Sequence, residues 1–180
     1  MMRIIAGECK GRRLAAPTWP GLRPTSDKLR ETLFNILARR IEGARVVDGF
    51  AGTGAVGLEA VSRGAAHVLF IETHRRAAAL VEENLRMCGV EEGYTIEGGD
   101  VTAVLEGLDP AAAFDVIFLD PPYDALPSSH MLDVAGRRLA PGGVLVLERA
   151  TRQEPDVPAT LDRIRDVRSG DSSLTFFARR

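Results

Sequence analysis

The sequence predicts an α/β fold in which a mainly parallel β-sheet is covered by helices on both faces. Three observations support this prediction. Short apolar runs alternate along the chain with longer segments whose apolar residues recur at helical spacing. Parallel strands joined by helices need right-handed crossovers, which place helices on both faces. The 180 residues, 45% of them hydrophobic, suffice for one substantial core and a small appendage.

The elements follow from this patterning and from residues that begin and end helices. Helices are predicted at 27–41, 54–63, 74–88, 101–107 and 128–139. Seven strands are predicted at 45–49, 67–72, 94–98, 115–119, 143–148, 163–168 and 173–178. Thr25, Ser26 and Asp27 offer N-caps for the first helix, and Gly64 and Gly89 follow the second and third. The result is a Rossmann-like sheet whose last two strands can form an antiparallel hairpin.

The first 24 residues are predicted to form a basic arm, separate from a main domain at 25–180. Two short extended pieces, 3–7 and 10–14, can pair as a small β-hairpin. Prolines and a glycine then mark an irregular connection that contains Trp19, the one tryptophan of the chain. Trp19 either contacts a nucleobase or packs the arm onto the main domain.

The net charge of -2 conceals a strong asymmetry along the chain. Residues 1–45 hold ten Lys and Arg against four Asp and Glu, whereas residues 46–180 hold thirteen against twenty-one. A basic front segment indicates a polyanionic partner such as RNA, because Lys and Arg contacts to phosphates supply most sequence-independent affinity. A solvated surface segment is the alternative. The candidate RNA-binding residues are Arg3, Lys10, Arg12, Arg13, Arg23, Lys28 and Arg30.

A glycine-rich turn follows the first predicted strand, within residues 46–60. Gly52, Gly54 and Gly57 satisfy the G-x-G-x-x-G pattern of dinucleotide-binding proteins, which alone is a weak signal. Asp48 lies just before these glycines; it would repel a pyrophosphate but suits a cationic amino-acid group. S-adenosylmethionine (SAM) carries such a group and no phosphate, so the pattern favours SAM over NAD. Glycines that only close a tight turn are the alternative.

Two further acids follow later strands and extend this site. Glu72 ends the strand at 67–72, where a carboxylate can accept hydrogen bonds from both ribose hydroxyls of a nucleoside. Asp100 follows the strand at 94–98 and accepts from an adenine amine, caps the next helix, or does both. The predicted cofactor-binding residues are Asp48, Phe50, Ala51, Gly52, Gly54, Glu72, Asp100 and Val101.

The most specific chemical signal is Asp120-Pro121-Pro122-Tyr123, directly after the buried strand at 115–119. The amine of a nucleobase is a poor nucleophile because its lone pair is delocalised into the ring. A carboxylate and a backbone carbonyl that accept its two N–H bonds pull the nitrogen towards tetrahedral geometry, and a tyrosine can stack on the base. We therefore predict that these four residues catalyse methyl transfer to a base amine, mainly by positioning. A proline-stiffened turn without function is the alternative.

Several blocks of the sequence resemble a known family. They lie at 3–7, 11–14, 22–25, 30–35, 50–54, 57–60, 62–65 and 120–123. Together they are similar to the bacterial 16S rRNA guanine-N2 methyltransferases that modify guanine 966, over residues 2 to about 148. The resemblance implies a seven-stranded class I methyltransferase fold that binds SAM through Asp48, Gly52, Gly54, Glu72 and Asp100, with catalysis at 120–123. It also implies 16S rRNA in the small ribosomal subunit or its precursor as substrate.

Three places depart from the pattern of this family. Cys9 and Lys10 stand where relatives commonly have Trp-Arg, so no RNA-stacking role is assigned to Cys9. Gly49 stands where a bulkier residue is common. The turn at 169–171 reads Ser-Gly-Asp in place of Tyr-Gly-Asp, and no function is assigned to it.

Other functions fit parts of the pattern. A DNA amino-methyltransferase shares Asp-Pro-Pro-Tyr, but the chain shows no target-recognition domain, and a protein glutamine methyltransferase usually begins the motif with Asn. An NAD-dependent oxidoreductase is disfavoured by Asp48, and a non-catalytic RNA-binding protein would not need the acids at the strand ends. We expect a cytoplasmic protein without metal or membrane contact, because the sequence lacks a secretory segment, a long apolar run and a metal-ligand spacing. We also expect it to be a monomer.

Overall fold

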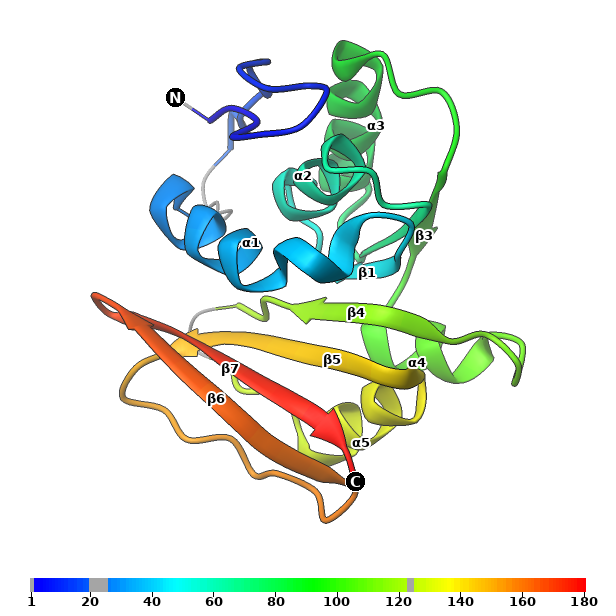
Figure 1. Cartoon of the computed structure of the whole chain (residues 1–180). Coiled ribbons are helices and arrows are strands. Elements are labelled where there is room, and N and C mark those ends of the chain that lie inside the picture. The colour runs from blue at the N-terminus through cyan, green and yellow to red at the C-terminus, as the bar shows by residue number, and fades with distance from the viewer. Residues whose placement is uncertain (1, 20–25, 123–124) are drawn as a thin grey trace.

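A computed structural model describes residues 2–19, 26–122 and 125–180 (Figure 1). Its centre is a seven-stranded sheet in the order β3-β2-β1-β4-β5-β7-β6. The first five strands run parallel, and β7 pairs antiparallel with both β5 and β6. The predicted Rossmann-like sheet and its C-terminal antiparallel hairpin are therefore confirmed.

The bounds of the elements agree closely with the patterning. The strands are β1 (Arg45–Gly49), β2 (His67–Glu72), β3 (Tyr94–Gly98), β4 (Phe114–Leu119), β5 (Leu139–Ala150), β6 (Leu161–Ser169) and β7 (Ser172–Arg179). The helices are α1 (Asp27–Ile41), α2 (Ala55–Ser62), α3 (Arg75–Cys88), α4 (Val101–Gly107) and α5 (Ser129–Arg137). Only the start of β5 differs by more than two residues. Phe114 pairs with Leu139 but Val116 pairs with Val144, so the register shifts at a bulge. Residues 140–142, which the patterning places in a loop, are therefore part of β5.

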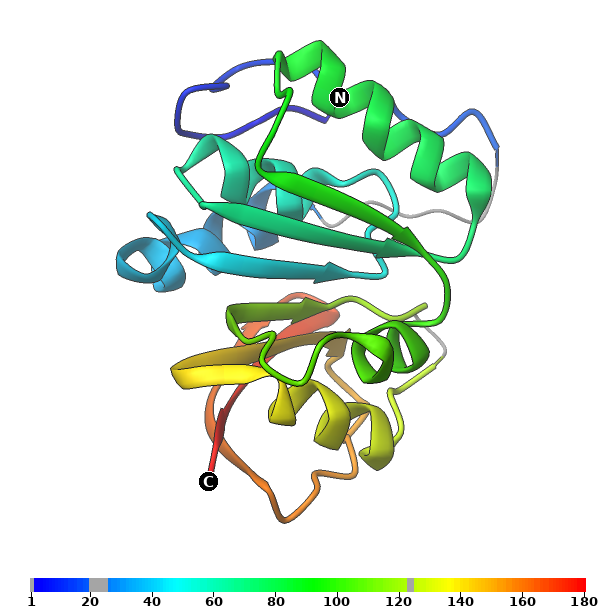
Figure 2. The same cartoon turned by 90° about the vertical axis from the view of Figure 1, so that its right-hand side faces the viewer.

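Helices cover both faces of the sheet, as Figures 1 and 2 show. One core lies between the sheet and α1, α2 and α3, and a second lies between the sheet and α4 and α5. Alternation along each strand supplies both: Val46 joins the first core and Val47 the second. In α2, a Cβ on Gly57 would clash with the ring of Phe70, so a glycine lets this helix approach β2.

The N-terminal arm is docked onto α2 and α3 of the main domain. Met2, Ile4 and Leu14 are buried in the core that α1, α2 and α3 share. The predicted β-hairpin is limited to one antiparallel bridge, between Arg3 and Arg13. A short hairpin alone is only marginally stable in water, and these buried side chains supply the packing that stabilises it.

Glu59 of α2 fastens the arm. Its fully buried carboxylate accepts hydrogen bonds from the backbone N–H groups of Ile5 (2.7 Å) and Ala6 (2.9 Å). It also accepts from Arg63 Nε at 2.7 Å, and Arg30 Nε lies 3.9 Å away. The arm thus depends on a side chain more than fifty residues further along the chain.

Within the part of the chain that the structure describes, no helix combines the length and apolar character needed to cross a membrane. The described residues also contain no group of three or more His, Cys, Asp or Glu placed to hold a metal ion.

Candidate active site

A cavity of about 770 Å³ lies at the carboxyl ends of the central strands. Four acidic side chains line it: Asp48 of β1, Glu72 of β2, Asp120 directly after β4, and Glu148 of β5. Each lies two residues after a side chain of the core under α1, α2 and α3, so strand alternation directs all four to that face. The structure thus brings Asp48, Glu72 and Asp120 together, as the sequence predicts. Glu148 was missed, although it closes the apolar run 144–147 in the same way.

Asp48 is the most buried of these acids, with 2% of its surface exposed. Its Oδ2 accepts a hydrogen bond from the backbone N–H of Gly57, at 2.8 Å. Burial raises the pKa of Asp48 from 3.8 to about 8; the Gly57 bond opposes this rise, and the charges of Asp120 and Glu72 add to it. A ligand that brings a cation into the cavity would relieve this unfavourable electrostatic environment.

Glu72 ties the glycine-rich turn to the end of β2. Its Oε2 accepts from the backbone N–H of Gly52 (2.8 Å), and its Oε1 accepts from the backbone N–H of His74 (2.9 Å). Phe50, Ala51 and Gly52 line the cavity. Phe50 has a left-handed backbone, with φ of 64°, which costs on the order of 1–3 kcal/mol in a residue other than glycine. Strain of this kind is typical of turns that bind ligands.

Asp120, Pro121 and Pro122 also line the cavity. The carbonyl oxygen of Pro122 accepts a hydrogen bond from the backbone N–H of Ala125, at 2.7 Å. The Pro122 carbonyl is therefore already engaged, whereas the sequence predicts that a backbone carbonyl of the motif accepts from the base amine. The Pro121 carbonyl is therefore the candidate backbone acceptor for the base amine beside Asp120. Tyr123, the fourth residue of the motif, lies outside the described residues.

Three predicted cofactor-binding residues are not among those that line the cavity: Gly54, Asp100 and Val101. Gly54 precedes α2 with φ of 74° and shapes the turn. Asp100 caps α4, since its Oδ1 accepts from the backbone N–H of Ala103 at 3.1 Å, so the capping interpretation is confirmed. Val101 is buried in the core of α4 and α5.

The end of β5 and the β6–β7 turn build the far wall of the cavity. The residues of this wall include Glu148, Arg149, Gln153, Ser169, Asp171 and Ser172. The backbone N–H of Thr151 donates to the carbonyl of Asp171 at 2.7 Å, which holds the turn against the end of β5. The turn at 169–171, which had no assigned role, therefore faces the site.

Arg149 contributes to this wall, but its charge is already balanced. Its Nε donates to Thr175 Oγ1 at 2.8 Å. Its Nη2 lies 3.2 Å from Asp166 Oδ1 and 3.6 Å from Glu154 Oε1. The cavity is therefore acidic overall, which disfavours a pyrophosphate ligand.

Comparison with known proteins decides the family. The family described as Conserved hypothetical protein 95 matches residues 2–178. The chain belongs to this family. The predicted resemblance to the 16S rRNA guanine-N2 methyltransferases is thereby confirmed at the level of the family.

Relatives of this family member carry methyltransferase names. Ribosomal RNA small subunit methyltransferase D of Escherichia coli (strain K12) is 40% identical over 122 residues, which cover 68% of this chain but only 60% of that protein. Putative rRNA methyltransferase YlbH of Bacillus subtilis (strain 168) is 32% identical over 177 residues, covering 97% of this chain and 95% of that protein. The solved structure of putative methyltransferase yhhF from Escherichia coli superimposes with a TM-score of 0.85 at 32% identity, covering 99% of this chain and 97% of that one.

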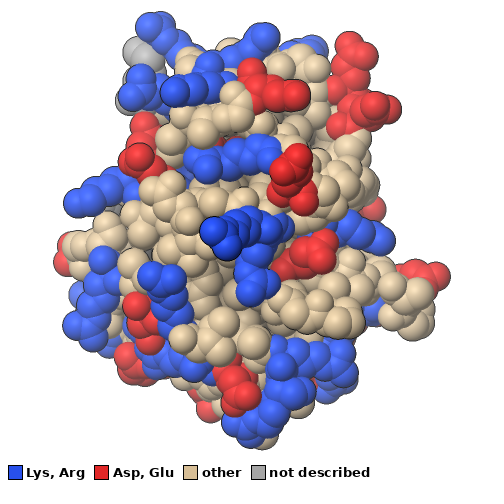
Figure 3. Space-filling view, in the orientation of Figure 1, with Lys and Arg blue, Asp and Glu red and all other residues tan. Residues whose placement is uncertain are grey.

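The basic arm of this family member presents most of its predicted cations to solvent. Arg3, Lys10, Arg12 and Arg13 of the arm are exposed, and so is Lys28 of α1. Figure 3 shows Lys and Arg side chains over the arm, at the top, and over β6 and β7, at the bottom. Arg12 also donates from Nη1 to the carbonyl of Met87 at 3.1 Å. Arg23 lies outside the described residues.

Arg30 is a correction to the predicted RNA-binding set. Its side chain is fully buried, and its Nη2 donates to the carbonyl of Arg3 and to Asp27 Oδ1. Burial lowers the pKa of Arg30, although Asp27 and Glu59 oppose the change. Arg30 therefore joins the arm to α1 and does not face a phosphate.

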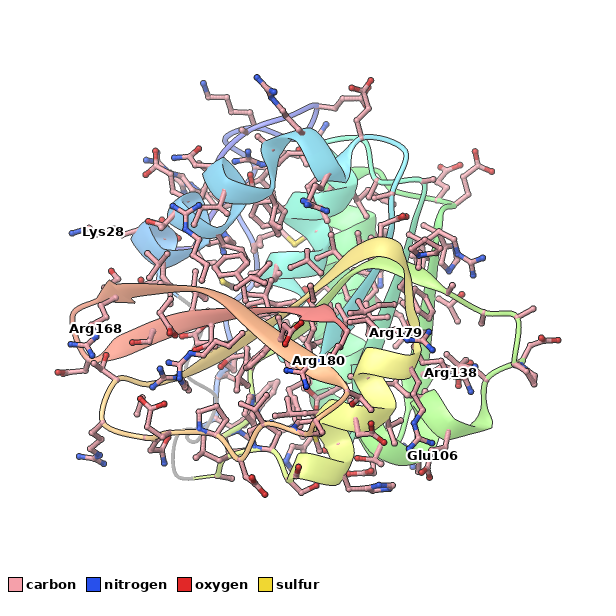
Figure 4. The ribbon with its side chains drawn as sticks, turned by 60° about the horizontal axis from the view of Figure 1, so that its bottom comes forward. Lys28, Glu106, Arg138, Arg168, Arg179 and Arg180 are labelled. Atoms are coloured by element: carbon pink, nitrogen blue, oxygen red, sulfur yellow. The ribbon has the colours of Figure 1, made fainter. Side chains whose placement is uncertain are left out.

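Two exposed cations lie next to residues that line the cavity: Lys28, which the charge pattern predicts, and Arg168, which it does not. Figure 4 shows Lys28 of α1 and Arg168 of β6 on the same side of the molecule, away from Arg179 and Arg180. The chain neighbours of these two residues, Leu29 and Ser169, line the cavity. Lys28 and Arg168 are thus exposed cations one residue away from the cavity lining.

Trp19 packs against the main domain. The guanidinium carbon of Arg76, in α3, lies 4.5 Å from the centroid of the Trp19 ring. Of the two interpretations considered for this tryptophan, the structure supports attachment of the arm.

Proposed function

We propose that this protein transfers a methyl group from SAM to the exocyclic N2 amine of a guanine in 16S rRNA, at guanine 966. The observation that carries the proposal is that Asp120 and Pro121 share one cavity with Asp48 and Glu72. Support also comes from the relatives, which are named as small-subunit rRNA and putative rRNA methyltransferases.

The residues of the cavity fit SAM. When bound, SAM supplies a methyl group made electrophilic by a sulfonium, and it brings a second cation in its amino group. The lining acids match these charges, and Asp48 lies deepest among them. A carboxylate accepts about four hydrogen bonds, so Glu72 keeps capacity for about one ribose hydroxyl beside its bonds to Gly52, His74 and the Thr73 hydroxyl.

The catalytic step depends on how the motif holds the amine. The Asp120 carboxylate and the Pro121 carbonyl accept the two N–H bonds of guanine N2, which draws its lone pair out of the ring. Fixed acceptors of this kind cost no reorganisation during reaction and act together with positioning. The Asp120 carboxylate also lies where it can take up the proton that nitrogen loses after the new N–C bond forms.

The substrate must present an unstacked base to this cavity. A guanine within folded RNA reaches such a pocket only when it is turned out of its stack. We propose that the exposed cations of the arm, residues 1–24, together with Lys28 and Arg168, hold the surrounding phosphates. Residues 25–180 then form the catalytic unit of a monomer that acts in the cytoplasm on the small subunit or its precursor.

Methylation by an Asp120→Ala variant tests the proposal. We expect the variant to lose methyl transfer by a factor on the order of 10³ or more, because one of the fixed acceptors is removed. Its SAM affinity should stay within a few fold of the unsubstituted protein. The assay incubates radiolabelled SAM with unmodified small subunits, naked 16S rRNA and DNA, and maps the labelled nucleotide.

The matched control is Asp156→Ala, which removes an exposed carboxylate outside the cavity lining. This variant should retain methyl transfer. Turnover by Asp120→Ala at the unsubstituted rate, or label in DNA instead of guanine N2 of 16S rRNA, would refute the proposal.

A further inference from the structure

The proposed donor site and the catalytic motif leave the far wall of the cavity without a role. This wall includes Glu148 and Gln153 at the end of β5, and Ser169, Asp171 and Ser172 at the β6–β7 turn. It lies beyond Asp120, as seen from Asp48 and Glu72, because the strand order is β2-β1-β4-β5. A base whose amine meets Asp120 therefore has this wall on its other side.

Glu148 is the residue of the wall that stands nearest to the motif in the sheet. Leu119 of β4 pairs with Leu147 of β5, so Asp120 and Glu148 are the next residues on two neighbouring parallel strands. Adjacent strands lie about 4.8 Å apart. Both side chains line the cavity, and Oε2 of Glu148 is buried. The two carboxylates are thus placed to contact neighbouring atoms of one ligand.

The chemistry of guanine matches this spacing. Its Watson–Crick edge presents two donors side by side, the N2 amine and N1–H. An amine held by Asp120 and the Pro121 carbonyl leaves N1–H pointing to the next acceptor along the wall. In adenine and 2,6-diaminopurine, N1 is an acceptor, and a carboxylate there would face a lone pair.

We propose that Glu148 recognises the target base by accepting the N1–H of guanine, and so determines that guanine is the base methylated. This inference rests on the proposed function and adds a specificity residue to it. Glu148 acts on the base edge next to the reacting nitrogen, while Asp120 and Pro121 hold the nitrogen itself. Reading a flipped base through its Watson–Crick edge needs only acceptors placed in this way.

The substitution Glu148→Gln separates recognition from catalysis. RNA substrates carry either guanine or 2,6-diaminopurine at the target position, and both bases offer the N2 amine. The unsubstituted protein should prefer guanine in kcat/KM by about 10-fold to 100-fold, the range expected for one hydrogen bond to a charged acceptor. In Glu148→Gln the side-chain amide can turn its NH₂ towards N1 of diaminopurine, so the preference should fall to within a few fold.

The comparison uses the ratio of kcat/KM for the two RNA substrates within one variant. A partial loss of folded protein lowers both values equally and leaves the ratio unchanged. Glu148→Ala, which removes the acceptor altogether, should also bring the two substrates close together. Glu97→Gln is the matched control, because Glu97 is an exposed acid on β3 outside the cavity lining and its loss should leave the guanine preference intact. SAM affinity should be unchanged in all three variants.

Two results would overturn the inference while leaving the proposed function in place. One is methylation of guanine RNA with an undiminished guanine preference in Glu148→Gln and Glu148→Ala. The other is equal use of both bases by the unsubstituted protein. Absence of any methylation by the unsubstituted protein would instead refute the proposed function, and this inference with it.

Discussion

Replacing Asp48 with asparagine should stabilise the ligand-free protein, and the gain should depend on pH. Folding raises the pKa of Asp48 from 3.8 to about 8, mainly by burial, so the folded state holds a proton that the unfolded state releases between these pH values. The stability contributed by the protonated group is full below pH 3.8 and is lost as the pH rises to about 8. Asparagine keeps an acceptor for the Gly57 N–H at the same position and does not titrate.

The size of the effect follows from the pKa. The free energy of unfolding of Asp48→Asn, relative to that of the unsubstituted protein, should grow by about 1.4 kcal/mol for each pH unit above the pKa that Asp48 has in the unfolded state. It should level off at about 6 kcal/mol above pH 8, because Asp48 is ionised in both states there. SAM binding should weaken in the same variant, because the carboxylate that faces the ligand cation is gone.

Urea unfolding of both proteins between pH 5 and pH 9 measures this difference, in the absence of SAM. Glu97→Gln, which removes an exposed carboxylate, should show the same pH dependence as the unsubstituted protein. A stability difference between Asp48→Asn and the unsubstituted protein that is equal at pH 5 and pH 9 would refute the assigned burial and charge of Asp48.

Two further predictions concern the arm. Glu59→Gln should lower the free energy of unfolding by about 3 kcal/mol, because the buried groups that contact Glu59 lose its negative charge. Limited proteolysis of this variant should then cut within residues 2–15. An arm as resistant to proteolysis as before would contradict the role of Glu59. Replacing both Arg12 and Arg13 with alanine should weaken RNA binding and reduce the slope of log K against log salt concentration by up to about 2. Arg179→Ala, on the other side of the molecule, should leave that slope unchanged. An unchanged slope in the double variant would show that the arm does not bind phosphates.

Much of the catalytic edge was predictable because it depends on short-range patterns. An apolar run that ends in an acid marks the carboxyl end of a buried parallel strand, and such ends meet at one edge of the sheet. This reasoning placed Asp48, Glu72 and Asp120 correctly at one cavity. It applied equally to Glu148, which was overlooked because it has no glycine or proline motif beside it.

The arm shows where such reasoning stops. Arg30 lies in the basic front segment, and its charge alone predicts a phosphate contact. The structure buries it, because the arm brings the Arg3 carbonyl to its guanidinium and α2 brings Glu59. No local pattern reports on these partners, which come from distant parts of the chain.

By itself, the sequence determined the order of helices and strands, the acids at the strand ends and the family motifs, because each of these is written in neighbouring residues. Only the tertiary structure decided which cations remain exposed, which proline carbonyl is used by a turn, and how strongly burial raises the Asp48 pKa. It also decided that the β6–β7 turn and Glu148 line the same cavity as Asp120 and Pro121. These properties depend on desolvation and on contacts between distant segments, and both arise only when the chain has packed.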